Sequence, residues 1–156
     1  MSFLKGKTLL LTGGGRSVLS DGTAGSIGYG IATAYAKEGT NLVITGRNVQ
    51  KLEKAKTELE SKYGIRVLAL AADIAAGSDN EATAKGVVEA AIKEFGRIDV
   101  LINNAQASAS GVTLAQHTTE QFDLAIYSGL YAAFYYMQAC YPYLAKAKGS
   151  VINFAS

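Results

Sequence analysis

The segment Thr12–Gly30, "TGGGRSVLSDGTAGSIGYG", joins an apolar run to a helical pattern and is rich in glycine. The preceding run, "TLLLTG", has the length and aliphatic content of a buried strand. The following pattern, "SIGYGIATAYAKEG", places small and apolar residues at helical spacing. A bare backbone turn that opens a helix lets a phosphate approach closely, and the helix N-terminus favours the phosphate charge. The alternative is a flexible surface loop without a ligand.

Four further apolar runs follow, and they predict a total of five strands. They are "NLVITG" (41–46), "RVLALAAD" (66–73), "IDVLINNA" (98–105) and "GSVINFAS" (149–156). Because they are continuous rather than alternating, we expect strands buried on both faces of a parallel sheet. Amphipathic helices are predicted within 48–64 and 78–96, the second opened by a capping box of Ser78 and Glu81. The alternation predicts one doubly wound α/β domain over residues 1–156, with strand order 3-2-1-4-5.

Composition excludes several classes of protein. The net charge is only +2, and there is no basic block of the kind that binds nucleic acid. With one cysteine, Cys140, and one histidine, we expect neither an internal disulfide nor a metal site, and we expect Cys140 to be a small buried apolar residue. There is no apolar run long enough to span a bilayer and no signal peptide, so we expect a cytoplasmic protein without a membrane partner.

The glycine-rich segment resembles the fingerprint of the short-chain dehydrogenases and reductases, which runs Thr-Gly, three residues, Gly, any residue, Gly. Thr12 and Gly13 match its start, and "SIGYGIA" matches its end with Gly28 as the last glycine. The spacing is longer by several residues, and Ser26 replaces the middle glycine, as in the Ser-Ile turn of the related enoyl-acyl carrier protein reductases. The resemblance implies a Rossmann-type fold in which Gly13 and the turn of Ser26, Ile27 and Gly28 hold a dinucleotide.

The resemblance extends along the whole chain. Within the family, the chain resembles the NADP-type members that are like 3-oxoacyl-acyl carrier protein reductase. Asp73, followed by Ile74, matches the family aspartate that hydrogen-bonds the adenine. "NNA" at residues 103–105 matches the Asn-Asn-Ala-Gly motif, with Gln106 in place of the glycine. This implies that Asn103 and Ala105 lie beside the cofactor. The alternatives are a capping or solvated acid at Asp73 and a simple loop turn at the paired asparagines.

The end of the second predicted strand bears on the choice of cofactor. An acidic residue there would bind the ribose hydroxyl of NAD, but Gly46 stands at that position and Arg47 follows it. A guanidinium is suited to the 2′-phosphate of NADP, and Arg16 in the glycine-rich segment is a candidate second cation. We therefore expect NADP rather than NAD. The alternative for Arg47 is a solvated side chain before a helix.

The family transfers hydride between the nicotinamide and a carbonyl or alcohol with a Ser, a Tyr and a Lys. Ser156, in "NFAS", matches the catalytic serine. The Tyr and Lys should be four residues apart, but no tyrosine in the sequence has a lysine at that spacing. We therefore expect the pair beyond residue 156, with the C-terminal part of the usual fold absent from this chain. A rival hypothesis is an NADP-binding module or sensor without turnover.

The segment 119–144 is similar to the family helix that carries a fourth catalytic residue, an Asn in a proton relay. Gly129 stands at that Asn position. The tyrosines of this helix are predicted to pack a subunit interface, because the corresponding family helix lines the dimer contact. They are Tyr127, Tyr131, Tyr135 and Tyr136. We therefore expect a homo-oligomer and a small carbonyl or alcohol substrate of unknown identity.

Overall fold

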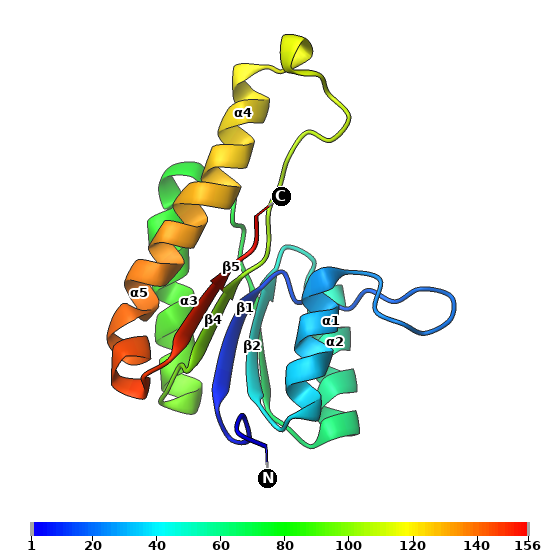
Figure 1. Ribbon diagram of the computed structural model, residues 1–156, viewed down its shortest axis with the longest axis vertical. Coiled ribbons are helices and arrows are strands. Elements are labelled where there is room, and N and C mark those ends of the chain that lie inside the picture. Colours follow the sequence, from blue (N-terminus) through cyan, green and yellow to red (C-terminus); the bar gives the residue numbers. More distant parts are fainter. Residues whose placement is uncertain (1, 156) are drawn as a thin grey trace.

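A computed structural model describes residues 2–155 and contains one five-stranded parallel sheet with helices on both faces (Figure 1). The strands lie in the order β3-β2-β1-β4-β5, which confirms the predicted doubly wound fold. Their bounds are β1 Thr8–Thr12, β2 Asn41–Gly46, β3 Val67–Ala71, β4 Val100–Asn103 and β5 Ser150–Asn153. The chain reverses its winding direction at β1, which pairs with β2 on one side and β4 on the other.

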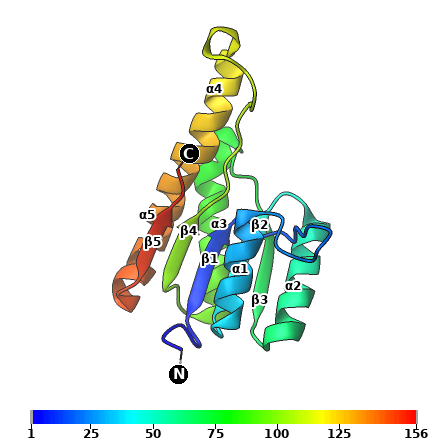
Figure 2. The same cartoon turned by 45° about the vertical axis from the view of Figure 1, so that its right-hand side comes forward.

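Helices cover the two faces of the sheet in separate layers, which Figure 2 shows from a second angle. α1 (Ile27–Lys37) and α2 (Val49–Tyr63) pack on one face. α3 (Asn80–Phe95) and α5 (Ala132–Ala147) pack on the other. The remaining helical segments are η1 (Gly77–Asp79), η2 (Leu114–Gln116), α4 (Thr119–Ala125) and the π-helical η3 (Ile126–Tyr131).

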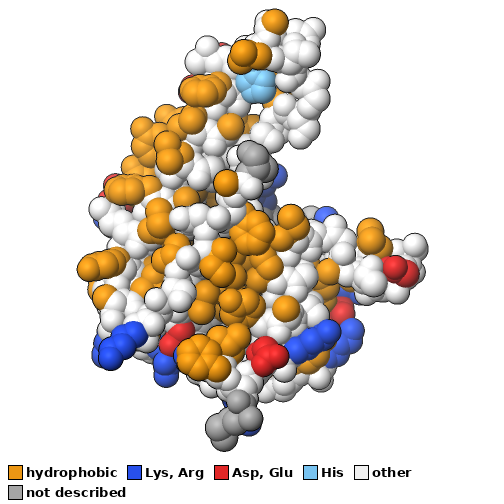
Figure 3. Space-filling view, in the orientation of Figure 1, with side chains coloured by type: hydrophobic (Ala, Val, Ile, Leu, Met, Phe, Trp, Pro, Cys, Tyr) orange, Lys and Arg blue, Asp and Glu red, His pale blue; other side chains and the backbone are white. Residues whose placement is uncertain are grey.

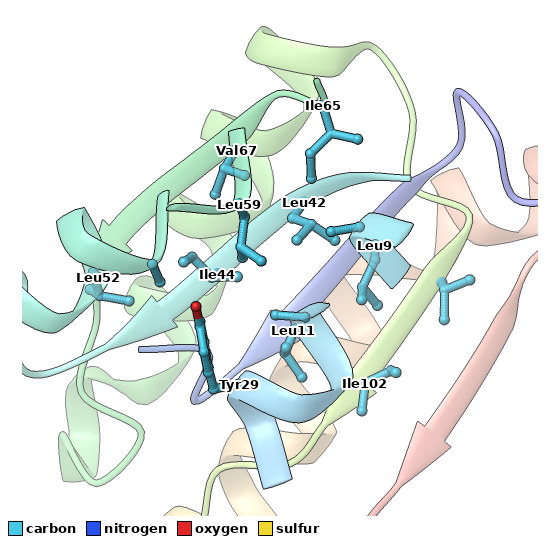
Figure 4. Packing of buried hydrophobic residues seen from close by; sticks show 14 residues of the cluster. Leu9, Leu11, Tyr29, Leu42, Ile44, Leu52, Leu59, Ile65, Val67 and Ile102 are labelled. Carbon is cyan, nitrogen blue, oxygen red and sulfur yellow. The ribbon is translucent and has the colours of Figure 1, made fainter. Parts of the chain in front are cut away.

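The alternation of side chains along β1 divides the core into two parts. Leu9 and Leu11 contribute to the layer under α1 and α2, whereas Leu10 contributes to the layer under α3 and α5. All three are fully buried. Figure 4 shows Leu9 and Leu11 in the same cluster as Tyr29 of α1 and Leu52 and Leu59 of α2. A strand that must supply both layers has no polar face, which explains the continuous apolar run in the sequence.

The helix boundaries agree with the sequence pattern at α2 and differ from it at α3. Asn48 caps α2 by accepting a hydrogen bond from the Lys51 amide at 2.9 Å, and Gly64 ends it in the left-handed conformation. The capping box predicted at Ser78 is wrong. Ser78 lies inside η1, a separate turn that precedes α3, and the residue that caps α3 makes no side-chain cap bond.

β5 is an exposed apolar edge strand, as the predicted strand order 3-2-1-4-5 implies. Its four residues are all exposed, whereas those of β1 are all buried. The reason is its place at the edge of the sheet, where it has β4 as its one neighbouring strand and lies away from the layer of α1 and α2. Figure 3 shows hydrophobic side chains gathered on this side of the molecule.

α4, η3 and α5 follow one another without a break and form a long arm that extends above the sheet in Figure 1. No helix within residues 2–155 is long and apolar enough to cross a bilayer. Cys140 of α5 is completely buried, as predicted, and burial raises the pKa of its thiol to about 12.

Asp99 connects the N-terminal ends of three strands, β1, β4 and β5. Its buried carboxylate accepts hydrogen bonds from the Thr8 amide at 2.9 Å and from the Arg97 guanidinium at 2.8 and 2.6 Å. Its carbonyl accepts from the Ser150 amide at 2.9 Å. Desolvation alone would raise the pKa of Asp99, but the bonds from Arg97 and Thr8 outweigh it, so the pKa lies below its ordinary value.

We expect Asp99→Asn to lower the free energy of unfolding at pH 7 by about 1 to 3 kcal/mol, because it removes a buried charge-assisted hydrogen bond. Since the folded-state pKa is lowered, the carboxylate stabilises the fold fully above its unfolded pKa of about 4 and loses this effect as the pH falls further. Urea unfolding of the wild type and of Asp99→Asn at pH 7 and pH 3 is the measurement. The difference between their free energies of unfolding should be smaller at pH 3. A difference independent of pH would contradict this account.

Candidate functional site

The main cleft lies where the carboxyl ends of β1, β2, β3 and β4 meet, on both sides of the switch in strand order. Open α/β sheets bind ligands at this position. The cleft has a volume of about 350 Å³. Its walls are Gly13, Ser26, Ile27, Gly28, Thr45, Gly46, Arg47, Ala72, Asp73, Ile74, Asn104, Ala105, Gln106 and Ala107.

Two glycines bring the turn after β1 close to the first turn of α1. Gly13 has a φ of +81°, a conformation that favours glycine, and its amide donates to the Thr45 carbonyl at 3.0 Å. A Cβ on Gly28 would lie 1.8 Å from the carbonyl oxygen of Gly13 and 2.8 Å from Nδ2 of Asn104. Only a residue without a side chain fits between these two groups. The bare backbone of the glycine-rich segment therefore allows the start of α1 to border the cleft.

Ser26 begins α1 as its N-cap, and its hydroxyl accepts a hydrogen bond from the Tyr29 amide at 3.4 Å. The helix N-terminus carries partial positive charge, and it opens into the cleft beside Ile27 and Gly28. An anionic group bound here would be stabilised by the helix dipole and by backbone amides.

Thr12 and Asn104 fix the loop after β4 to the end of β1, a role that the sequence does not predict for either residue. The Thr12 hydroxyl accepts from the backbone amides of Asn104 and Ala105 at 3.0 and 3.1 Å. The Asn104 side chain donates to the Thr12 carbonyl at 3.0 Å. The second Asn of "NNA" therefore positions the cleft wall. In the sequence, the feature that could have indicated this role is the pair of asparagines directly after an apolar run.

Asn103 lies outside the main cleft and ties β4 to β5. Its side-chain amide donates to Oδ1 of Asn153 at 2.8 Å, while its own Oδ1 is buried and has no hydrogen-bond partner in the described chain. Asp73 is exposed at the cleft, and its carboxylate accepts from the Ala75 amide at 3.0 Å. Asp73 thus combines a turn-forming role with a place in the cleft wall.

A side hollow of about 610 Å³ adjoins the main cleft between the end of β2 and the start of α2. It is lined in part by Arg47, Asn48 and Lys51, together with Ser17 of the glycine-rich segment. Within residues 2–155, neither Arg47 nor Lys51 forms an ion pair, and the hollow's described lining contains no carboxylate. The hollow therefore presents two cations to a ligand.

Arg16 does not line the main cleft or the side hollow. Its guanidinium instead pairs with the Glu58 carboxylate of α2, which also accepts from Lys62 at 2.7 Å. Arg16 and Lys62 hold the pKa of Glu58 at about 2. In the described chain, the candidate second cation at Arg16 is therefore paired with an acid 42 positions away, a partner that no local pattern in the sequence indicates.

A second cavity of about 310 Å³ lies beside the main cleft and shares Ile74, Ala105 and Gln106 with it. Its lining combines apolar residues of the arm and of the end of β5 with several polar side chains. The apolar residues include Ala125, Ile126, Leu130, Ala133 and Phe154, and the polar ones include Thr12, Asn103, Gln106, Ser128 and Asn153. A concave site with both kinds of group suits a small organic molecule that also forms hydrogen bonds. Ser156, the predicted catalytic serine, lies outside the described residues.

Gln106 and Gly129 lie next to each other in the lining of the second cavity. A Cβ on Gly129 would lie 3.3 Å from Nε2 of Gln106. Gly129 belongs to the π-helical segment η3. The start of η3 is held by Asn80, which donates to the Tyr127 carbonyl at 2.9 Å. Two of the positions at which the sequence departs from the family motifs are therefore neighbours.

The comparisons with known proteins agree with this geometry. A sequence model of the short chain dehydrogenases matches residues 16–156. The chain belongs to the short-chain dehydrogenase family. A 12alpha-hydroxysteroid dehydrogenase of a Clostridium species is 61% identical over all of this chain and 58% of its own length. A sorbose reductase of Schizosaccharomyces pombe is 34% identical over the whole chain and 57% of its own length.

Solved structures of the family have the same fold. L-sorbose reductase from Gluconobacter frateurii, complexed with NADPH and L-sorbose, superposes with a TM-score of 0.85 at 29% identity over 100% of this chain and 55% of its own. An NAD+-bound xylitol dehydrogenase has a TM-score of 0.83 at 25% identity over 99% of this chain and 54% of its own. The chain thus spans a little over half the length of these relatives.

We expect Gly28→Ala to destabilise the chain by about 1 to 3 kcal/mol or more, because the new methyl group overlaps the Gly13 carbonyl. Gly30 is the matched control on the same helix, since a Cβ there would meet nothing nearer than the Ala24 methyl at 3.6 Å. Gly30→Ala should raise stability by about 0.5 to 1 kcal/mol. Chemical unfolding of both variants is the measurement, and equal effects would contradict the close approach.

Proposed function

We propose that the chain is the dinucleotide-binding domain of an NADP-dependent oxidoreductase of the short-chain type. In this proposal Gly13, Ser26, Ile27 and Gly28 bind the pyrophosphate. Asp73 and Ile74 contact the adenine, and Asn103 and Ala105 support the nicotinamide side. The bound cofactor supplies or accepts the hydride.

The observation that carries the NADP assignment is the pair of unneutralised cations in the side hollow. Arg47 and Lys51 lie beside Gly46, at the strand end where an acid would favour NAD. A 2′-phosphate has the charge to match both cations, whereas a ribose hydroxyl has none. The NADPH-bound L-sorbose reductase supports this assignment, and the NAD+-bound xylitol dehydrogenase is a reminder that the fold alone is compatible with either nucleotide.

For the substrate we propose an uncharged secondary alcohol or ketone on a large apolar skeleton, of the hydroxysteroid class. The support is the 61% identity to a 12alpha-hydroxysteroid dehydrogenase, together with the apolar side chains that the arm and the end of β5 contribute to the second cavity. Ser156 orients the substrate oxygen in this proposal. The proton is transferred by a Tyr and a Lys that the 156 residues do not contain at the required spacing.

We further propose a cytoplasmic homo-oligomer that packs through the aromatic surface of the arm. Tyr127 and Tyr131 are exposed, and their rings lie 5.4 Å apart, with Tyr135 next at 6.2 Å from Tyr131. Tyr136 must be removed from the predicted interface. It is 2% exposed and packs in the core under α3 and α5.

We expect Arg47→Asp to raise the Kd for NADPH by about tenfold to a hundredfold, because it removes a charge-assisted bond and adds a repulsive charge. The Kd for NADH should be nearly unchanged. Titration calorimetry with both nucleotides is the measurement.

Lys54→Asp is the matched control, because Lys54 is an exposed cation of α2 that does not line the side hollow. It should leave both Kd values close to those of the wild type. Equal losses for NADPH and NADH in Arg47→Asp would show that Arg47 does not select the phosphate.

A second prediction distinguishes the oxidoreductase hypothesis from that of an NADP-binding module without turnover. The 156-residue chain should not oxidise NADPH with a ketosteroid, because general acid catalysis worth about 100-fold to 10,000-fold is missing without the Tyr and Lys. A protein that continues this chain with a helix carrying both residues should do so. Absorbance at the NADPH band follows the reaction. Turnover by the short chain, or its absence in the continued one, would contradict the proposal.

A further inference from the structure

The segment between the end of β1 and the start of α1 is long, and it is attached to α2 as well as to α1. We call residues 14–25 the glycine loop. Its Arg16 amide donates to the Lys51 carbonyl of α2 at 2.9 Å. The chain then returns on itself, because the Gly25 amide donates to the Ser17 carbonyl at 2.7 Å. Figure 1 shows this segment extending sideways from the helix layer of α1 and α2.

A cluster of charged and phenolic groups lies between the glycine loop and these two helices, and three of its members line a hollow of about 560 Å³ there. It consists of Arg16, Tyr29, Glu58 and Lys62, and we call it the Glu58 cluster. Glu58 is at its centre, with Arg16 on one carboxylate oxygen and Lys62 on the other. Only 22% of the Glu58 side chain is exposed. Burial raises the pKa of Tyr29 to about 12, and the neighbouring Glu58 adds to the rise.

The Glu58 cluster joins the elements that border the main cleft. Tyr29 belongs to the first turn of α1, next to Gly28 in the cleft wall. Arg16 follows Gly15 and precedes Ser17, both of which line the side hollow. A Cβ on Gly15 would lie 3.2 Å from the Lys51 Cβ, so the loop rests directly on α2. Glu58 itself lines neither the main cleft nor the side hollow.

We infer that Glu58 is a positioning residue for nucleotide binding: through Arg16 it holds the glycine loop on α2 and keeps the Arg16 guanidinium out of the cleft. This rests on the proposed function. It assigns Arg16 a role different from that of Arg47. Arg16 holds the loop whose two flanking residues, Gly13 and Ser26, line the main cleft in which both nucleotides are proposed to bind, whereas Arg47 discriminates between the nucleotides. A loop held in place before binding loses less conformational freedom when the ligand arrives.

The test uses Arg16→Met, Glu58→Gln, the double variant and Glu58→Asp in the 156-residue chain. Each of the first two should raise the Kd for NADPH and for NADH by the same factor, about twofold to tenfold. The double variant should be no worse than either single variant, because both remove one contact. Glu58→Asp, which keeps the charge, should restore part of the affinity. Glu53→Gln, at an exposed position of α2, is the control and should change nothing.

Hydrogen exchange gives a readout that does not depend on nucleotide. In Glu58→Gln the amides of Arg16 and Gly25 should exchange faster than in the wild type, while the unfolding temperature changes little. Unchanged exchange would overturn the inference. If the wild type bound neither nucleotide, the proposed function would fail, and the exchange result would still decide whether Glu58 holds the loop.

One further outcome would overturn the inference in a distinct way. If Arg16 were a phosphate ligand restrained by Glu58, Glu58→Gln would tighten the binding of NADPH alone, and Arg16→Met would weaken NADPH alone. Additive losses in the double variant would likewise show that the two residues act separately.

Discussion

The contact between Gly28 and the Gly13 carbonyl is the constraint on which the rest of the site depends. A methyl group on Gly28 would lie 1.8 Å from that oxygen, so the first turn of α1 and the end of β1 are as close as two backbones can be. The same space is bounded by the Asn104 amide, which is itself bonded to the Thr12 carbonyl. Two consecutive elements, β1 and α1, thus meet the segment after β4 at one point. The main cleft borders this meeting point and is lined by Gly13, Gly28 and Asn104.

The fold was largely predictable from the sequence because each strand must serve two layers. Leu9, Leu10 and Leu11 alternate between the layers, and such a strand appears in the sequence as an uninterrupted apolar run. The glycines of the site were predictable for a related reason, since a close approach excludes every other residue. Both features are local, so the sequence shows them directly.

Features that depend on distant partners were not predictable in this way. Arg16 looked like a cofactor ligand until the structure placed Glu58 beside it. Tyr136 looked like its neighbours Tyr127 and Tyr131, but the rotation of the helix through η3 and α5 buries it. Ser78 looked like the N-cap of α3, but it lies in the separate turn η1. In each case the residue type indicates which interactions are possible, and the fold determines which neighbour the residue contacts.

The close approach of Gln106 to Gly129 makes the effect of a substitution at one position depend on the residue at the other. A Cβ at position 129 would lie 3.3 Å from Nε2 of Gln106, which is a tight contact. A side chain at 129 therefore requires the Gln106 carboxamide to move away, or a smaller residue at 106. Residues in contact do not contribute independently to stability, so the effect of a substitution at 129 depends on which residue occupies 106.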